Sequence, residues 1–154
     1  MATTASSARV QARPDEVWAV LATFGDISRW GRGVTHSTML TSGPVGPGSV
    51  RRVQVGRVAL RETIVRWEPD QAIGYTIAGL PPVVVSATNT WTLAPVGGGG
   101  TEITLTSDVS TRGGPAVARL VGRRLGQAGR DLVAGLVDDL SDTDGVQHRQ
   151  GEDR

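Results

Sequence analysis

The central part of the chain, residues 50–109, consists of short β-type segments joined by turns. Valine, isoleucine, threonine and tryptophan dominate it, and turn residues recur at intervals of roughly 10 to 15 residues. Parallel neighbours would need a long crossover connection, so turns this short require antiparallel neighbours. The pattern therefore predicts an antiparallel meander. Its strands are expected at Val50–Val55, Leu60–Trp67, Ile73–Ile77, Val83–Leu93 and Thr101–Val109.

Two short helices are predicted before this region, between expected strands at Ala8–Ala12 and Val34–Leu40. Pro14 suits the first helical turn, because the N–H that it lacks would have no partner there. Asp15 and Glu16 favour the positive end of the helix dipole. A helix is therefore expected to begin at Pro14, with a second short helix after it.

The apolar pattern becomes helical again after Pro115 and predicts a last helix of about 25 residues, ending near Leu140. One wide apolar stripe on a terminal helix indicates that it lies across the concave face of the sheet. The stripe comprises Val117, Leu120, Val121, Leu125, Ala128, Leu132, Leu136 and Leu140. A single domain is expected over residues 8–140, with flexible tails at 1–7 and 141–154.

Composition excludes several kinds of chemistry. The chain has 154 residues, the length of one domain, and contains no cysteine. This excludes disulfides, thiolate nucleophiles, iron–sulfur clusters and cysteine-based zinc sites. Only two histidines are present, His36 and His148, so no metal site and no cofactor are expected.

The charged residues argue against several classes of binding partner and chemistry for this chain. The formal net charge is +1, all 16 basic residues are arginine, and the missing lysine excludes a lysine Schiff base. Arginine, valine, glycine and alanine are raised together, which indicates a GC-rich coding sequence of actinobacterial type. Near-neutral charge with dispersed basic residues argues against nucleic-acid binding. No long apolar run or signal peptide is found, which predicts a cytoplasmic protein without a membrane span.

Several motifs are similar to those of a known superfamily. They are Pro14-Asp15-Glu16-Val17-Trp18-Ala19-Val20-Leu21, Phe24-Gly25-Asp26-Ile27-Ser28-Arg29-Trp30, Gly48-Ser49-Val50-Arg51, Glu62, Gly74-Tyr75-Thr76-Ile77, and Thr90-Trp91-Thr92-Leu93-Ala94-Pro95 with Gly100-Thr101. Together they resemble the polyketide cyclase/dehydrase-like branch of the START/Bet v 1-like superfamily, also called SRPBCC proteins. The resemblance implies an α+β helix-grip fold, in which a curved antiparallel sheet of about seven strands wraps around a long C-terminal helix.

The resemblance also implies a cavity between sheet and helix, open near the short helices and the hairpin loops. A hydrophobic small molecule is the expected ligand, and the protein is expected to be a monomer or weak homodimer. Three functions stay open: an enzyme of the polyketide cyclase/dehydratase kind, a non-catalytic carrier or sensor of a lipid, isoprenoid or aromatic metabolite, and a regulatory interaction module.

Arg51, Glu62 and Tyr75 are the candidate catalytic residues. If Arg51 points inward as in relatives, strand alternation places Glu62 and Tyr75 on the same face. Arg51 would hold a carbonyl or carboxylate, Glu62 would act as a base, and Tyr75 would donate a proton or hydrogen bond. The alternatives are a structural Arg51–Glu62 ion pair and ligand contact without catalysis.

Candidate ligand-binding residues follow from the same alternation of faces. On the strand at residues 83–93, one face carries Trp91 and the other is rich in threonine, and Trp91 is expected to point inward. Trp30 lies where relatives have the gate of the cavity. The full set is Trp30, Val53, Val55, Leu60, Ile77, Trp91, Leu132 and Leu136. Trp18 and Trp67 are expected in the core, and His36 and Asp108 in solvent.

Overall fold

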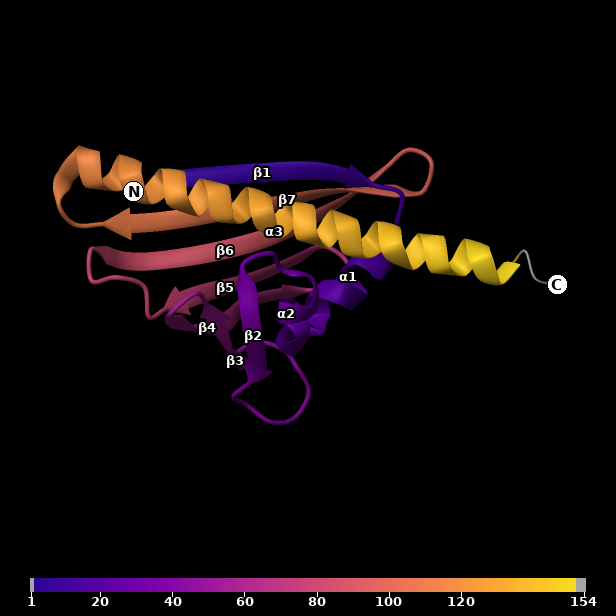
Figure 1. Ribbon diagram of the computed structural model, residues 1–154, viewed down its shortest axis with the longest axis horizontal. Coiled ribbons are helices and arrows are strands. Elements are labelled where there is room, and N and C mark those ends of the chain that lie inside the picture. Colours follow the sequence, from indigo (N-terminus) through magenta and orange to yellow (C-terminus); the bar gives the residue numbers. More distant parts are fainter. Residues whose placement is uncertain (1, 152–154) are drawn as a thin grey trace.

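The computed structural model describes residues 2–151 and contains one seven-stranded antiparallel sheet in the order β1-β7-β6-β5-β4-β3-β2 (Figure 1). The predicted helix-grip architecture is confirmed. The strands are β1 (Ala2–Val10), β2 (Val34–Met39), β3 (Val50–Val55), β4 (Val58–Glu68), β5 (Ala72–Ala78), β6 (Val84–Val96) and β7 (Gly100–Thr111). The helices are α1 (Pro14–Ala22), the 3-10 turn η1 (Phe24–Asp26), α2 (Ile27–Trp30) and α3 (Gly114–Gly151).

The short helices begin where the sequence predicts. Pro14 is the first residue of α1, and Asp15 and Glu16 follow in its first turn. The buried side chains Val17 and Leu21 hold α1 against the core. Pro14 has no N–H to leave unpaired in the first turn, and the negative charges of Asp15 and Glu16 interact favourably with the positive end of the helix dipole. These residues explain why the helix starts here.

Both chain ends differ from the expected flexible tails. Residues 2–7 are part of β1, which pairs with β7 over its whole length, from Ala2 opposite Val109 to Val10 opposite Thr101. Helix α3 continues past Leu140 to Gly151. Met1 and residues 152–154 lie outside the described residues, as does the side chain of His148.

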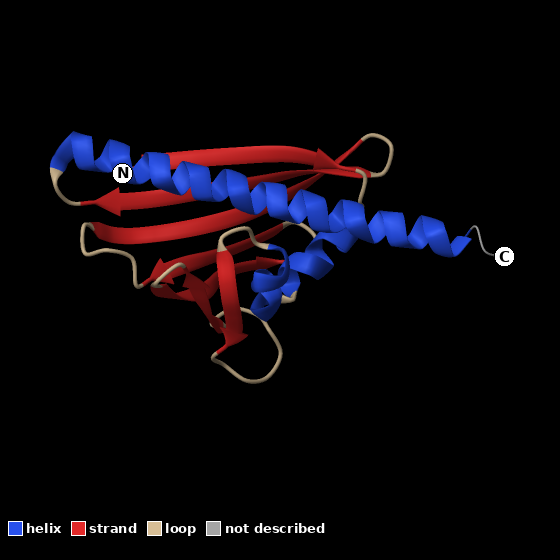
Figure 2. Ribbon diagram, in the orientation of Figure 1, coloured by secondary structure: helices blue, strands red, loops and turns tan. Residues whose placement is uncertain are grey.

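Helix α3 lies against β1 and β7, at one edge of the sheet, and meets α2 near its middle (Figure 2). Gly135 permits the contact with α2, because a Cβ atom there would clash with the carbonyl oxygen of Trp30. A bidentate ion pair from Arg29 to Asp139, at 2.5 and 3.1 Å, joins the same two helices. No helix within residues 2–151 is both long and apolar enough to cross a membrane.

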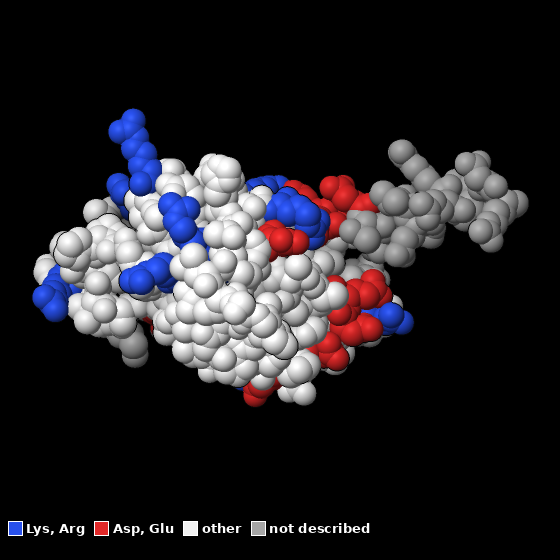
Figure 3. Space-filling view, turned by 90° about the horizontal axis from the view of Figure 1, so that it is seen from below, with Lys and Arg blue, Asp and Glu red and all other residues white. Residues whose placement is uncertain are grey.

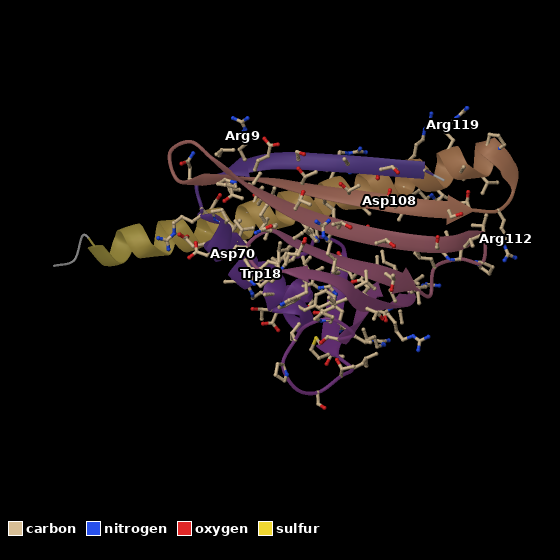
Figure 4. The ribbon with its side chains drawn as sticks, turned by 180° about the vertical axis from the view of Figure 1, so that it is seen from behind. Arg9, Trp18, Asp70, Asp108, Arg112 and Arg119 are labelled. Atoms are coloured by element: carbon tan, nitrogen blue, oxygen red, sulfur yellow. The ribbon has the colours of Figure 1, made fainter. Side chains whose placement is uncertain are left out.

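The core lies between the concave face of the sheet and the helices. Trp91, Tyr75, Phe24 and Leu136 are among its most deeply buried side chains. On the convex face, Asp108 of β7 accepts a hydrogen bond from the Thr3 hydroxyl, away from the core (Figure 4). Trp91 therefore points into the core and Asp108 away from it.

Candidate functional site

Arg51 and Glu62 form a buried ion pair at directly opposite positions of β3 and β4. Arg51 Nε donates to Glu62 Oε1 at 2.8 Å, and Nη1 donates to the Phe24 carbonyl oxygen at 2.8 Å. Nη2 lies 2.8 Å from the same Oε1 without making a well-directed hydrogen bond. The two side chains are 3% and 7% exposed, so each charge relies on the other for compensation.

Aromatic rings enclose the guanidinium group. Its central carbon lies 3.6 Å from the Phe24 ring centroid and 4.7 Å from that of Tyr75, distances at which a cation is attracted to a ring face. The space among Arg51, these rings, Trp30 and Trp91 is too small to admit a water molecule. The structure brings the three candidate catalytic residues together in a closed part of the core.

Tyr75 is held in its protonated form. Burial raises the pKa of the Tyr75 hydroxyl above its ordinary value, and the nearby Glu62 carboxylate raises it further. Arg51 and hydrogen bonds from Asn89 and Trp91 lower the pKa and only partly offset these effects. The Trp91 indole donates to the Tyr75 oxygen at 3.3 Å. At neutral pH Tyr75 can therefore donate a hydrogen bond but cannot serve as a base.

An open groove of about 520 Å³ lies elsewhere on the protein, between the β3–β4 turn, the β5–β6 loop and the first half of α3. We call it the aliphatic groove. Valine, leucine and proline line it, with Arg124 as its one charged residue. The lining residues are Val55, Val58, Leu60, Leu80, Pro81, Val83, Val84, Val117, Leu120, Val121, Arg124 and Leu125. Its size lies within the range of small-molecule sites.

The predicted ligand-binding residues are divided among the aliphatic groove, the closed space beside Arg51 and the rest of the core. Val55 and Leu60 line the aliphatic groove. Trp30 and Trp91 border the closed space beside Arg51, with ring centroids 5.9 Å apart in an edge-to-face arrangement. The remaining predicted residues pack in or against the core: Val53, Ile77, Leu132 and Leu136.

Most groove residues were not among the sequence candidates. Val117, Leu120, Val121 and Leu125 belong to the predicted apolar stripe of α3, but the sequence assigned that stripe to contact with the sheet. The signal that could have identified the groove is the run Leu80-Pro81-Pro82-Val83, an apolar loop where turn residues are usually polar. The resemblance implied an opening near the short helices and the hairpin loops; the β3–β4 turn and the β5–β6 loop line this groove, and no short helix does.

Side chains suited to metal binding do not gather in the described part of the chain. No group of three or more histidine, aspartate or glutamate residues is placed to hold a metal ion there. His36 is exposed on β2.

The sequence was compared with models of known protein families. The model of the family described as "Polyketide cyclase / dehydrase and lipid transport" matches residues 1–140. The chain belongs to this family. Membership in the polyketide cyclase/dehydrase and lipid transport family confirms the predicted SRPBCC resemblance. A comparison with curated proteins finds no match.

Solved structures share the fold of this family member at low sequence identity. XoxI from Bacillus cereus is 16% identical with a TM-score of 0.79, over 94% of this chain and 99% of that one. The ZhuI aromatase/cyclase from Streptomyces sp. R1128 is 17% identical with a TM-score of 0.76, over 91% and 93%. Ara h 8.0201 is 15% identical with a TM-score of 0.69, over 92% and 98%. At these identities the likeness is one of fold.

Proposed function

We propose that this protein binds an aliphatic small molecule in the aliphatic groove, as a non-catalytic carrier or sensor. The observation that carries the proposal is the lining, which is apolar except for Arg124 and includes no carboxylate, imidazole or phenol. Such a lining provides apolar contact area and one cationic group to orient a polar end. It provides no general acid or base for catalysis in the groove.

The first experiment is native mass spectrometry of the gently purified protein, before and after extraction with organic solvent. A retained molecule with a long saturated or isoprenoid chain supports the proposal. A retained polycyclic aromatic molecule contradicts it, because the lining includes no aromatic ring for stacking and no hydrogen-bonding side chain other than Arg124.

Val121→Trp should block the aliphatic groove. Val121 is half-buried on α3 and lines the groove, so an indole ring there would fill part of the volume in which the ligand is proposed to bind. The affinity for a fluorescent long-chain fatty acid, measured by titration, should fall at least about tenfold, or about 1.4 kcal/mol.

The matched control is Ala128→Trp, an exposed position on the same helix and outside the groove lining. It should leave the affinity for the fatty acid unchanged. Equal losses in the two variants, or tight binding by Val121→Trp, would show that the ligand does not use this groove.

Polyketide cyclase-like catalysis is a second candidate, favoured by the buried Arg51 Nη2, which makes no hydrogen bond within the described part of the chain. A substrate oxygen would satisfy this group if the core opened to admit it. Arg51 would then stabilise enolate charge while Glu62 and Tyr75 handle protons. Loss of turnover of a linear poly-β-ketothioester in both Glu62→Gln and Tyr75→Phe, with the fold retained, supports this function, and unchanged turnover in either variant rejects that residue's role.

We further propose that the protein acts in the cytoplasm as a monomer or weak homodimer. The lack of cysteine and of a membrane-spanning helix within residues 2–151 is compatible with this location. Size-exclusion chromatography with light scattering measures the oligomeric state directly.

A further inference from the structure

The end of the molecule that holds the aliphatic groove is basic. The three segments that form the groove, residues 50–61, 79–87 and 112–130, contain nine of the 16 arginines and no aspartate or glutamate. Glu62, the next acidic residue along β4, is buried and paired with Arg51. Blue side chains gather over one end of the surface, and most of the red ones lie toward the other (Figure 3).

Several of these arginines have no carboxylate partner among the described residues. Arg112 and Arg119 extend from the end where β7 stops and α3 begins, while Asp70 lies toward the opposite end (Figure 4). The ion pairs among the described residues include none of the exposed arginines at the groove end, namely Arg57, Arg61, Arg112, Arg119, Arg123 and Arg124. By contrast, Arg9 pairs with Glu102 and Arg66 pairs with Glu68.

Apolar side chains project among these arginines. Leu120 of α3 is 56% exposed, and Val55 and Val58 at the β3–β4 turn are 40% and 43% exposed. Exposed aliphatic residues surrounded by unpaired arginines match the chemistry of an anionic bilayer surface, where phosphates meet the arginines and acyl chains meet the apolar groups.

We propose that this end of the protein docks on the surface of a bilayer that contains anionic lipids, with the mouth of the aliphatic groove against the headgroups. The charge complementarity of the unpaired arginines selects the anionic surface, and Leu120, Val55 and Val58 enter the boundary between headgroups and acyl chains. Docking in this orientation would let an apolar ligand move between bilayer and groove without crossing water. The docking surface stands independently of ligand binding, since it is built from exposed groups.

The test is co-sedimentation of the full chain with vesicles of phosphatidylcholine and phosphatidylglycerol, compared with vesicles of phosphatidylcholine alone. The protein should sediment with the mixed vesicles and stay in solution with the neutral ones. Each arginine near an anionic surface changes partitioning about fivefold, so Arg119→Gln with Arg123→Gln should weaken binding about 25-fold. Neither residue lines the groove, so fatty-acid binding should stay unchanged.

Arg9→Gln with Arg66→Gln is the matched control, because it removes the same net charge outside the groove-forming segments. It should bind the mixed vesicles as the unmodified protein does. Likewise Leu120→Ser should weaken binding several-fold, whereas Val65→Ser, which alters a side chain of similar exposure (57%) outside the groove, should not. Equal effects in test and control variants, equal binding to neutral vesicles, or no binding at all would overturn the proposal.

Discussion

Glu62→Ala should lower the free energy of unfolding by about 3–5 kcal/mol, because it leaves the Arg51 guanidinium buried without its counter-charge. Arg51 is 2% exposed as a residue, so water cannot replace the lost carboxylate without opening the core. The Phe24 carbonyl oxygen would remain as its one hydrogen-bond acceptor among the contacts described above. Urea unfolding followed by circular dichroism measures the loss.

Glu68→Ala is the control for this prediction. Glu68 also pairs with an arginine, at 2.6 Å, but the side chains of Arg66 and Glu68 are 51% and 47% exposed. Breaking an exposed pair of this kind should change the free energy of unfolding by less than about 1 kcal/mol. If Glu62→Ala were no more damaging than Glu68→Ala, the Arg51 site would have to be open to water.

A double replacement separates the two roles of the buried pair. Arg51→Met with Glu62→Leu removes both charges and retains apolar volume, which restores much of the stability lost by Glu62→Ala when the pair serves packing alone. A stable double variant that still binds fatty acid supports the carrier function. Turnover of the linear poly-β-ketothioester by the same double variant discriminates between the two roles: retained turnover indicates a structural ion pair, and lost turnover in a stable variant indicates a catalytic one.

The faces of the strands were predictable from the sequence. Once Arg51 is placed inward, the two-residue period puts Val53 on the same face of β3, and cross-strand pairing does the same for Glu62 on β4. Short turns made the antiparallel order of residues 50–109 predictable as well. Both features are determined by residues that are close in the sequence or lie on adjacent strands. A local sequence pattern therefore contains enough information to predict them.

The location of the open space was not predictable in the same way. Val53 and Val55 have the same parity, but Val53 is 2% exposed and Val55 is 40% exposed. The 3-10 turn η1 contacts β3, whereas Val55 is the last residue of β3 and borders the open groove. Contacts between elements that are distant in the sequence decide which part of a strand is covered, and periodicity contains no information about them.

The start of β1 was missed for a related reason. Residues 2–7 are alanine, serine and threonine, so the alternation of partly buried and exposed side chains along them has almost no contrast in hydrophobicity. Their strand forms through pairing with β7, a partner that lies some hundred residues later in the chain. Because these residues are small and polar, the sequence predicted a flexible tail where the structure has the start of an edge strand.

Trp91→Ala should also lower the free energy of unfolding by about 3–5 kcal/mol, because Trp91 is among the largest fully buried side chains and its loss leaves a cavity. The variant loses the edge-to-face contact with Trp30 and the hydrogen bond to Tyr75. Trp67→Ala, which removes a half-buried indole that contacts Trp18, should cost less in the same urea titration.

Trp91→Phe then tests whether this side chain contacts the ligand. Phenylalanine retains most of the apolar volume and loses the indole N–H, so the fold should survive with a smaller loss of stability. Because Trp91 borders the closed space beside Arg51 and does not line the aliphatic groove, fatty-acid affinity should stay unchanged. A folded Trp91→Phe protein that no longer binds fatty acid would mean that the ligand enters the core, and the proposed site would have to move from the groove to the space around Arg51 and Tyr75.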